Sequence, residues 1–247
     1  MTPAAQTVRQ ADAATKAARA RPGLWATTWA LLAKDLLIEW RTRARLNALT
    51  FFAICTLLLF SFALGANAVA LRQHAAGYFW LAIFFASTLS LGESFRIEHE
   101  NHALEGVRLA GAQGRAIFLA KAIGNTVMLW GLGAVLAPLS IAIFDLKVVL
   151  GLGHLALIML VGSMAISAAG PFYAAIAANV RARDVLLPVL LFPVLVPVLI
   201  SSVKATALVF EGDPMLQLPD WLTLLGTLNV IYWGLGLALF PRIIEDL

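Results

Sequence analysis

The densest group of chemically capable side chains lies between Phe95 and Leu109, where the sequence contains five charged residues and two histidines. His99 and His102 are three residues apart, so a helix would place them on one face, but no adjacent third ligand completes a metal site. Two interpretations stay open. The segment is either a short helix that touches another protein or a solvated loop that carries charge.

The sequence lacks the motifs of a nucleotide-hydrolysing or metal-dependent enzyme. The pattern Gly-x-x-x-x-Gly-Lys-Ser/Thr does not occur, and the stretch from Gly106 to Gly114 has no lysine to contact phosphates. His74 and His154 are isolated, and lone histidines at helix ends are weak candidates for axial haem ligands. Cys55 is the single cysteine, which excludes a disulfide framework. We therefore expect a non-catalytic chain with no catalytic residue and no metal site.

Six apolar runs separate the polar segments. A hydrocarbon layer of about 30 Å requires roughly 20 apolar residues in a helix, and runs this continuous exclude a β-barrel. A composition that is 61% hydrophobic and 13% charged agrees with this reading. The sequence predicts an all-α integral membrane protein whose six transmembrane helices cover approximately Ala48 to Val69, Tyr78 to Phe95, Ile117 to Phe144, Leu152 to Ala178, Val185 to Phe210 and Trp221 to Phe240.

Lysine and arginine are distributed unevenly between the two sides that these spans define. Fifteen of the 18 lie before the first span, in or beside the second and fourth connections, or after the last span. Only Arg72, Lys147 and Lys204 fall on the other side. Because cationic residues are enriched on the cytoplasmic side, both termini are predicted to be cytoplasmic. The net charge of +4 then reflects membrane orientation, and nucleic acid is not an expected partner.

Two segments precede the spans. Residues 1–23 are predicted to be a disordered cytoplasmic tail, and residues 24–46 an amphipathic helix in the headgroup layer, followed by a six-helix domain over residues 47–247. The apolar stripe of this interfacial helix includes Leu32 and Leu36, and its indole rings are expected to anchor it: Trp25, Trp29 and Trp40.

The fifth span contains three prolines, Pro188, Pro193 and Pro197. Each removes an amide donor and crowds the preceding turn, so we expect the helix to bend or partly unwind. A broken helix at membrane depth would indicate a mobile element or a transport path. A static kink required only for packing is the alternative.

Polar residues near the ends of the second, third and fourth spans have mostly structural interpretations. Lys121 is expected to snorkel to water, whereas the role of Glu93 stays open. Asn125, Ser163 and Ser167 are expected to form hydrogen bonds between helices.

Three regions of the chain carry motifs of charged, aromatic or proline residues, and the motifs follow one another in a fixed order. They are Lys34-Asp35-Leu36, Glu39, Arg41, Asn47, Phe51-Phe52 and Phe62-Ala63-Leu64-Gly65 at the first span; Phe95-Arg96, Glu98, Leu104-Glu105 and Lys121 at the second connection; and Arg181, Leu186-Leu187-Pro188, Phe192-Pro193 and Pro197-Val198-Leu199-Ile200 at the fourth connection and fifth span. In this order the chain resembles the haem exporter protein B family (CcmB), the permease subunit of the bacterial cytochrome c maturation system, over roughly Lys34 to Leu247.

The resemblance implies an export-type (ABC-2) permease fold in the bacterial inner membrane. The implied partners are a second copy, two cytoplasmic ATPase subunits that bind ATP, a haem-handling membrane subunit and a periplasmic haem chaperone, with haem present in the complex. The segment at about 95–115 becomes the expected ATPase contact, in which Glu98 and Glu105 pair with basic groups and Leu104 fills an apolar pocket. The implied coupling residues are Phe95, Arg96, Glu98, Leu104, Glu105 and Arg108.

The chain departs from the family pattern at His102, where a Gly is common, and at Gly111, where a Pro is common.

The leading hypothesis is a permease subunit that converts ATPase closure into helix movement during haem delivery and release of the haem-loaded chaperone. Two alternatives stay open: an export permease for a lipid, glycan or drug, and a passive membrane scaffold for haem-handling partners.

Overall fold

The computed structural model describes residues 23–65, 67–100, 113–178 and 183–245, and within them the side chains of 92–100, 172–188, 190 and 244–245 are not described. In these four ranges the chain forms seven helices and no strand. Six of the helices are long and apolar enough to cross a membrane. The prediction of an all-α, multi-pass membrane protein is confirmed.

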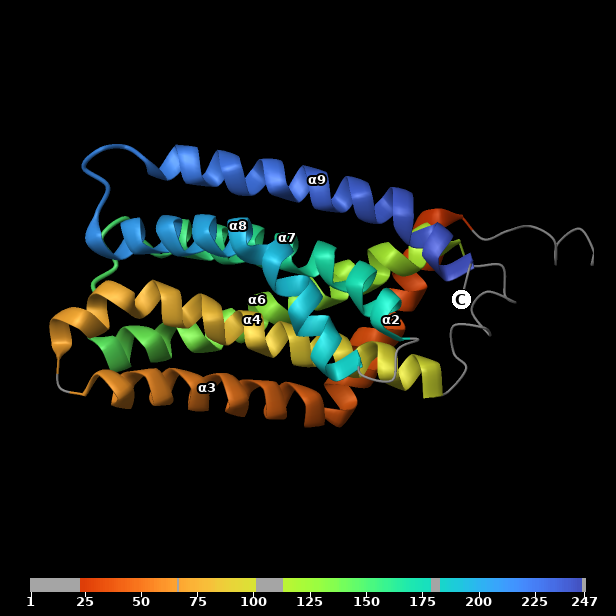
Figure 1. Ribbon diagram of the computed structural model, residues 1–247, viewed down its shortest axis with the longest axis horizontal. Coiled ribbons are helices and arrows are strands. Elements are labelled where there is room, and N and C mark those ends of the chain that lie inside the picture. Colours follow the sequence, from red (N-terminus) through yellow and green to blue (C-terminus); the bar gives the residue numbers. More distant parts are fainter. Residues whose placement is uncertain (1–22, 66, 101–112, 179–182, 246–247) are drawn as a thin grey trace, which may run out of the picture.

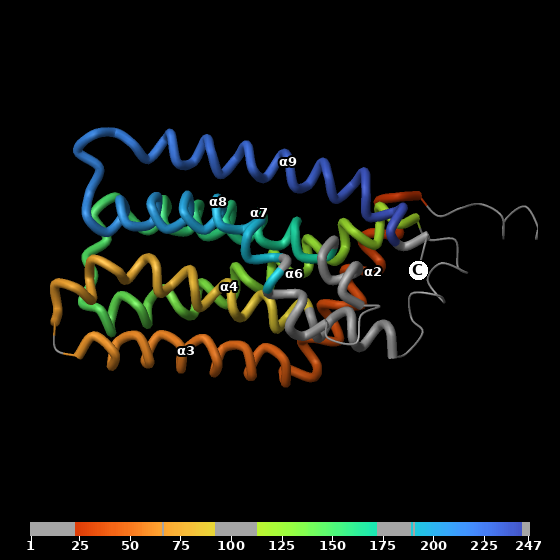
Figure 2. Tube along the Cα trace, in the orientation of Figure 1, coloured from red at the N-terminus to blue at the C-terminus, as the bar shows by residue number. Residues whose placement is uncertain are grey.

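Six helices run side by side as a bundle, and a shorter helix, α2, lies across one end of it (Figure 1). We call this the α2 end, where the C-terminal helix also ends, whereas the connections 145–151 and 212–217 lie at the opposite end (Figure 2). The helices are α2 (Leu24–Thr42), α3 (Ala44–Leu64), α4 (Ala68–Glu100), α6 (Gly114–Phe144), α7 (Leu152–Ala178), α8 (Arg183–Glu211) and α9 (Leu218–Glu245).

Helices α4 and α7 form the centre of the bundle, and α3 and α9 form its two edges in Figure 1. Close packing of α7 on α4 depends on Gly162, because a Cβ atom there would lie 2.3 Å from Cη2 of the buried Trp80. The Trp80 indole donates to the Thr206 hydroxyl of α8 at 2.9 Å, so a single side chain connects three helices. Small residues that admit large neighbours are the usual basis of helix packing in membranes.

The N-terminal helix ends four positions earlier than residue 46, the boundary predicted from the sequence. Arg43 adopts a left-handed conformation, with φ of 49°, and separates α2 from α3. The Glu39 carboxylate accepts a hydrogen bond from the Leu46 amide at 3.2 Å and so satisfies a donor in the first turn of α3. This local capping starts the first span at Ala44, not at Ala48.

Helix α4 is longer at both ends than the predicted span from Tyr78 to Phe95. Asn67 caps its start, since the Asn67 side-chain oxygen accepts from the Ala70 amide at 3.1 Å. The apolar part of α4 ends at Leu91, and the helix continues to Glu100. Polar residues therefore extend an element that begins in the apolar bundle, which hydropathy alone does not detect.

Helix α8 is continuous from Arg183 to Glu211 and changes direction in its cyan N-terminal part (Figure 1), so of the two predicted outcomes, bending or partial unwinding, the structure shows bending. The Tyr232 hydroxyl of α9 donates to the Val194 carbonyl at 2.6 Å, in the turn between Pro193 and Pro197. Pro188 lies on the same helix, but its side chain is outside the described set. A neighbouring helix thus donates a hydrogen bond into the proline-containing part of α8, and the helix continues through its prolines.

Candidate functional site

The predicted coupling residues are only partly described. Phe95, Arg96 and Glu98 belong to the part of α4 that follows Leu91, and their side-chain positions are not described. The remaining three, Leu104, Glu105 and Arg108, lie outside the described residues. The segment therefore stays a prediction, and the described residues next to it define the site.

Two ion pairs connect α2 to the spans beside this segment. Lys121 of α6 lies with its Nζ 2.9 Å from Asp35 Oδ2, and its side chain is only 11% exposed. Asp35 Oδ1 is also 3.2 Å from Lys34 Nζ. The prediction that Lys121 snorkels to water is wrong, because the α2 carboxylate offers the ammonium a closer partner. Charged groups this well buried are stabilised only when they are paired.

The second ion pair joins α2 to the start of α3. Arg45 Nη1 lies 3.5 Å from Glu39 Oε2, and the two side chains are 23% and 16% exposed. The same guanidinium donates through Nη2 to the Ser90 hydroxyl of α4. Glu39 therefore has two functions: it caps α3 and it holds Arg45 against α4.

A line of buried hydrogen bonds continues from Ser90 into the bundle. The Ser90 hydroxyl donates to Asn125 Oδ1 of α6 at 3.1 Å, and Asn125 Nδ2 donates to the Ser167 hydroxyl of α7 at 3.1 Å. The expected interhelical bonding of Asn125 and Ser167 is confirmed, whereas Ser163 is buried without a hydrogen bond among the described residues. The polar chain from Glu39 to Ser167 connects α2, α3, α4, α6 and α7.

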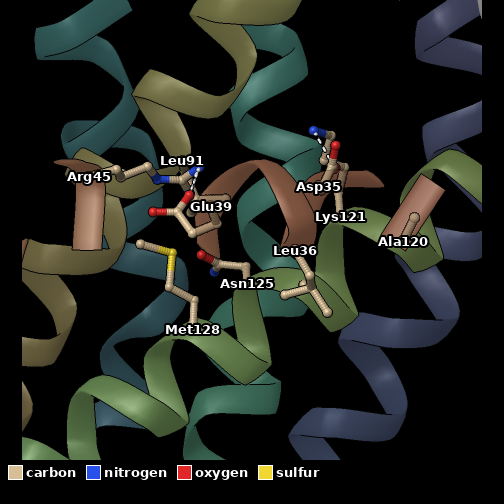
Figure 3. A pocket seen from close by; sticks show the side chains of 10 residues that line it. Asp35, Leu36, Glu39, Arg45, Leu91, Ala120, Lys121, Asn125 and Met128 are labelled. Carbon is tan, nitrogen blue, oxygen red and sulfur yellow. Dashed lines mark ion pairs between the residues drawn. The ribbon is translucent and has the colours of Figure 1, made fainter. Parts of the chain in front are cut away.

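We call these residues the α2-end cluster: Asp35, Glu39, Arg45, Ser90, Lys121, Asn125 and Ser167. Figure 3 shows a small cavity beside them, with the Glu39–Arg45 and Asp35–Lys121 pairs drawn as dashed lines. Its volume of ≈ 50 Å³ has room for a few water molecules but not for a cargo. Because each acid faces a base, the arrangement connects helices and offers no free acid, base or nucleophile to a reaction.

The described side chains contain no group of three histidine, cysteine or acidic residues close enough to hold a metal ion. The predicted anchor residues Trp25, Trp29 and Trp40 are 72%, 72% and 68% exposed. Leu32, assigned to the same stripe, instead packs against the bundle, where a Cβ at Gly124 would lie 3.4 Å from it. The helix therefore binds the bundle with Leu32, Asp35 and Glu39 and presents its indole rings on an adjacent face.

Comparison with known proteins identifies the family of this chain. Residues 26–241 match the model of the family described as "CcmB protein". The chain belongs to the CcmB family. Three relatives, each named "Heme exporter protein B", illustrate the range: those of Pseudomonas aeruginosa (31% identical, 84% of this chain and 93% of the relative), Rhodobacter capsulatus (30%, 74% and 84%) and Bradyrhizobium diazoefficiens (28%, 74% and 82%).

The CcmB match begins inside α2 and ends inside α9, so the whole α2-end cluster lies within it. Sequence reasoning named Asp35, Glu39 and Lys121 separately but did not pair them, and it did not consider Ser90. The available signal was the occurrence of polar residues at the same predicted depth of successive spans. Pairing them required the helix order in space, which a single sequence does not supply.

Proposed function

We propose that this chain is the membrane permease subunit of an ABC transporter complex that acts in haem delivery and in release of the haem-loaded chaperone during c-type cytochrome biogenesis. The observation that carries the proposal is the CcmB family match across all six spans. Relatives that cover most of the chain are named heme exporter protein B, which favours haem over a lipid, glycan or drug. The subunit is non-catalytic, and ATP hydrolysis takes place on a separate ATPase.

The proposed location is the bacterial inner membrane, with the α2 end and both termini in the cytoplasm. The excess of lysine and arginine on that side, fifteen against three, supports this orientation. The exposed Trp25, Trp29 and Trp40 then lie at the level of the headgroups and anchor α2 there. The proposed partners are the ATPase, a second copy, a haem-handling membrane subunit and a periplasmic haem chaperone.

The α2-end cluster supports a route by which ATPase closure moves the spans. The segment at about 95–115 is proposed to contact the ATPase through the six predicted coupling residues. Ser90 lies one residue before the end of the α4 span and bonds to Arg45 and Asn125. A pull on the extension of α4 therefore reaches α3 and α6 directly and α7 through Ser167. The change of direction in the N-terminal part of α8, the helix that carries the three prolines, supplies a compliant element in a helix that packs against α4.

Removal of the two acids of the coupling segment tests this function. We expect Glu98→Ala combined with Glu105→Ala to weaken co-purification of the ATPase, to uncouple its hydrolysis from the permease and to reduce the yield of holo-cytochromes c. Glu211→Ala with Asp220→Ala, two acids at the opposite end, is the matched control. Unchanged co-purification, ATPase rate and cytochrome yield in the Glu98/Glu105 variant would refute the assignment.

A passive scaffold would not need α8 to move. The rings of Phe192 in α8 and Phe84 in α4 have centroids 5.4 Å apart, so cysteines at these positions are within reach of a short bifunctional thiol reagent once Cys55 is replaced by Ser. A moving permease loses cytochrome maturation on cross-linking and regains it when a cleavable reagent is removed. Full maturation in the locked protein would support the scaffold.

A deletion strain separates the two classes of cargo. Loss of holo-cytochromes c, restored by the wild-type chain, is the result expected for haem delivery. Normal cytochromes with drug sensitivity or an envelope defect would instead favour export of a lipid, glycan or drug.

A further inference from the structure

Lys204 is an exposed cation on a largely apolar face of α8. It lies in α8 seven residues before the end of the candidate span at Glu211, which is about 10 Å along a helix. No described residue makes a hydrogen bond or an ion pair with it. A charged side chain at this depth is costly in hydrocarbon, so a membrane-embedded lysine indicates a functional partner.

The direction of α8 makes escape of the ammonium to water difficult. Cα–Cβ bonds tilt toward the N-terminus of a helix. Helix α8 runs from the α2 end to the opposite end. The Cα–Cβ bond of Lys204 therefore tilts toward the α2 end, away from the membrane surface that lies nearer to Lys204. Snorkelling to the lipid headgroups at the opposite end therefore works against the local geometry.

The exposed residues that precede Lys204 on its face of α8 are apolar. Val189, Pro193 and Ile200 share one face of α8 with Lys204, since their spacing of 4, 7 and 4 residues returns to the same side of the helix. Val189 and Ile200 are 60% and 49% exposed, and Phe192 borders this face at 45%. We call these five residues the Lys204 face. They offer one positive charge at one end of a hydrophobic strip.

We propose that the Lys204 face is a contact site for an amphiphilic cargo with a flat apolar body and a carboxylate, and that this cargo is haem, whose propionate binds the Lys204 ammonium. This inference rests on the proposed function, because it assumes that haem is the molecule delivered. The pairing is complementary in both parts: a carboxylate neutralises the membrane-embedded cation, and the porphyrin ring covers the apolar strip.

Two other occupants fit the Lys204 face less well. A lipid phosphate requires the ammonium to reach the surface against the tilt of its Cβ bond. A straight transmembrane helix with an acidic residue would have to follow α8 through the change of direction in its N-terminal part to cover the whole Lys204 face.

The test compares haem with haem dimethyl ester, which keeps the ring and the iron but has no carboxylates. Each is titrated into phosphatidylcholine nanodiscs that contain the full chain with its ATPase, and the quenching of tryptophan fluorescence is corrected for empty nanodiscs. We expect the wild type to bind haem about tenfold more tightly than the ester, because a charge-assisted contact is lost in the ester. Lys204→Gln should bind the two porphyrins equally, whereas Lys204→Arg should keep the preference.

Lys147→Gln is the matched control, because it removes an exposed lysine from the connection at the same end. Equal binding of haem and ester by the wild type, or a preference that Lys204→Gln and Lys147→Gln change alike, would overturn the inference. So would a haem preference that disappears in phosphatidylglycerol nanodiscs, since an anionic lipid headgroup would then compete for Lys204, and so would loss of a partner subunit from Lys204→Gln with the preference intact. Failure here leaves the ATPase co-purification and cytochrome yield of the Glu98/Glu105 variant unaffected, so the two proposals fail separately.

Discussion

The two ends of the bundle use charge in different ways. At the α2 end, Arg45 and Lys121 are 23% and 11% exposed, and their carboxylate partners come from a different helix. At the opposite end, the ion pair between Arg72 and Asp145 is 52% and 81% exposed, and the α8–α9 connection is held by Asp213, which accepts from the amides of Gln217 and Leu218 at 2.8 Å. The ion pairs that join helices are therefore largely buried at the α2 end and exposed at the opposite end.

This difference indicates which end transmits movement. A buried polar chain has a low tolerance for separation, because each broken contact leaves a desolvated group without a partner. An exposed ion pair exchanges with water at little cost. A displacement applied at the α2 end is therefore carried into the neighbouring helices, whereas the opposite end can change its side-chain contacts with a small change in free energy.

The largest contrast is expected between the two arginines. Arg45→Ala removes the partner of the largely buried Glu39 and the donor to Ser90, and we expect the free energy of unfolding to fall by about 3 kcal/mol. Arg72→Ala removes only an exposed pair and should cost at most about 1 kcal/mol. Titration with dodecyl sulfate in dodecyl maltoside micelles, followed by circular dichroism, measures both. Equal losses would remove the distinction between the ends.

The contact between α2 and α6 is expected to have an intermediate effect. A double-mutant cycle with Asp35→Asn and Lys121→Met should give a coupling energy of about 1 kcal/mol, because the two groups touch at 2.9 Å but Asp35 keeps some access to water. The same cycle with Lys34→Met in place of Lys121→Met is the control, since Lys34 is 45% exposed. Larger coupling to Lys34 than to Lys121 would show that α2 is not held by the bundle.

Each hydrogen bond of Asn125 should contribute less than this ion pair. Asn125→Ala removes one bond to Ser90 and one to Ser167, and interhelical bonds in membranes average about 0.6 kcal/mol each, so we expect a loss of about 1 kcal/mol. Ser167→Ala in the Asn125→Ala background should then be nearly neutral. An additive loss in the double variant would show that Ser167 acts through another contact.

The sequence predicted the spans well because the requirement that fixes them is local. An apolar run of sufficient length must form a helix in hydrocarbon wherever its neighbours lie, so the six spans follow from composition. The boundaries were less accurate. They depend on single caps, such as the Glu39 carboxylate on the Leu46 amide and the Asn67 side chain on the Ala70 amide.

The α2-end cluster was predictable only in part, because its contacts join residues far apart in the chain. Snorkelling was a reasonable expectation for Lys121 near a helix end, but α2 lies across that end and brings Asp35 to it. For the same reason the tryptophan stripe was found while the packing face of α2 was not. Leu32 fits both the apolar stripe with the tryptophans and the face that packs on the bundle. The position of α6 determines that it packs on the bundle.

The smallest effect is expected at Asp145, and it isolates the exposed charge pair from its backbone. Asp145 has a left-handed conformation with φ of 48°, which Asn also tolerates, so Asp145→Asn removes the charge and leaves the turn intact. We expect a loss of less than about 0.5 kcal/mol, abolished in 0.5 M NaCl because salt screens exposed charges. Glu39→Gln, measured in the same micelles, should lose more and should keep its loss in salt. If the Asp145→Asn loss persisted in salt, the opposite end would also hold its helices by charge, and transmission could not be assigned to the α2 end alone.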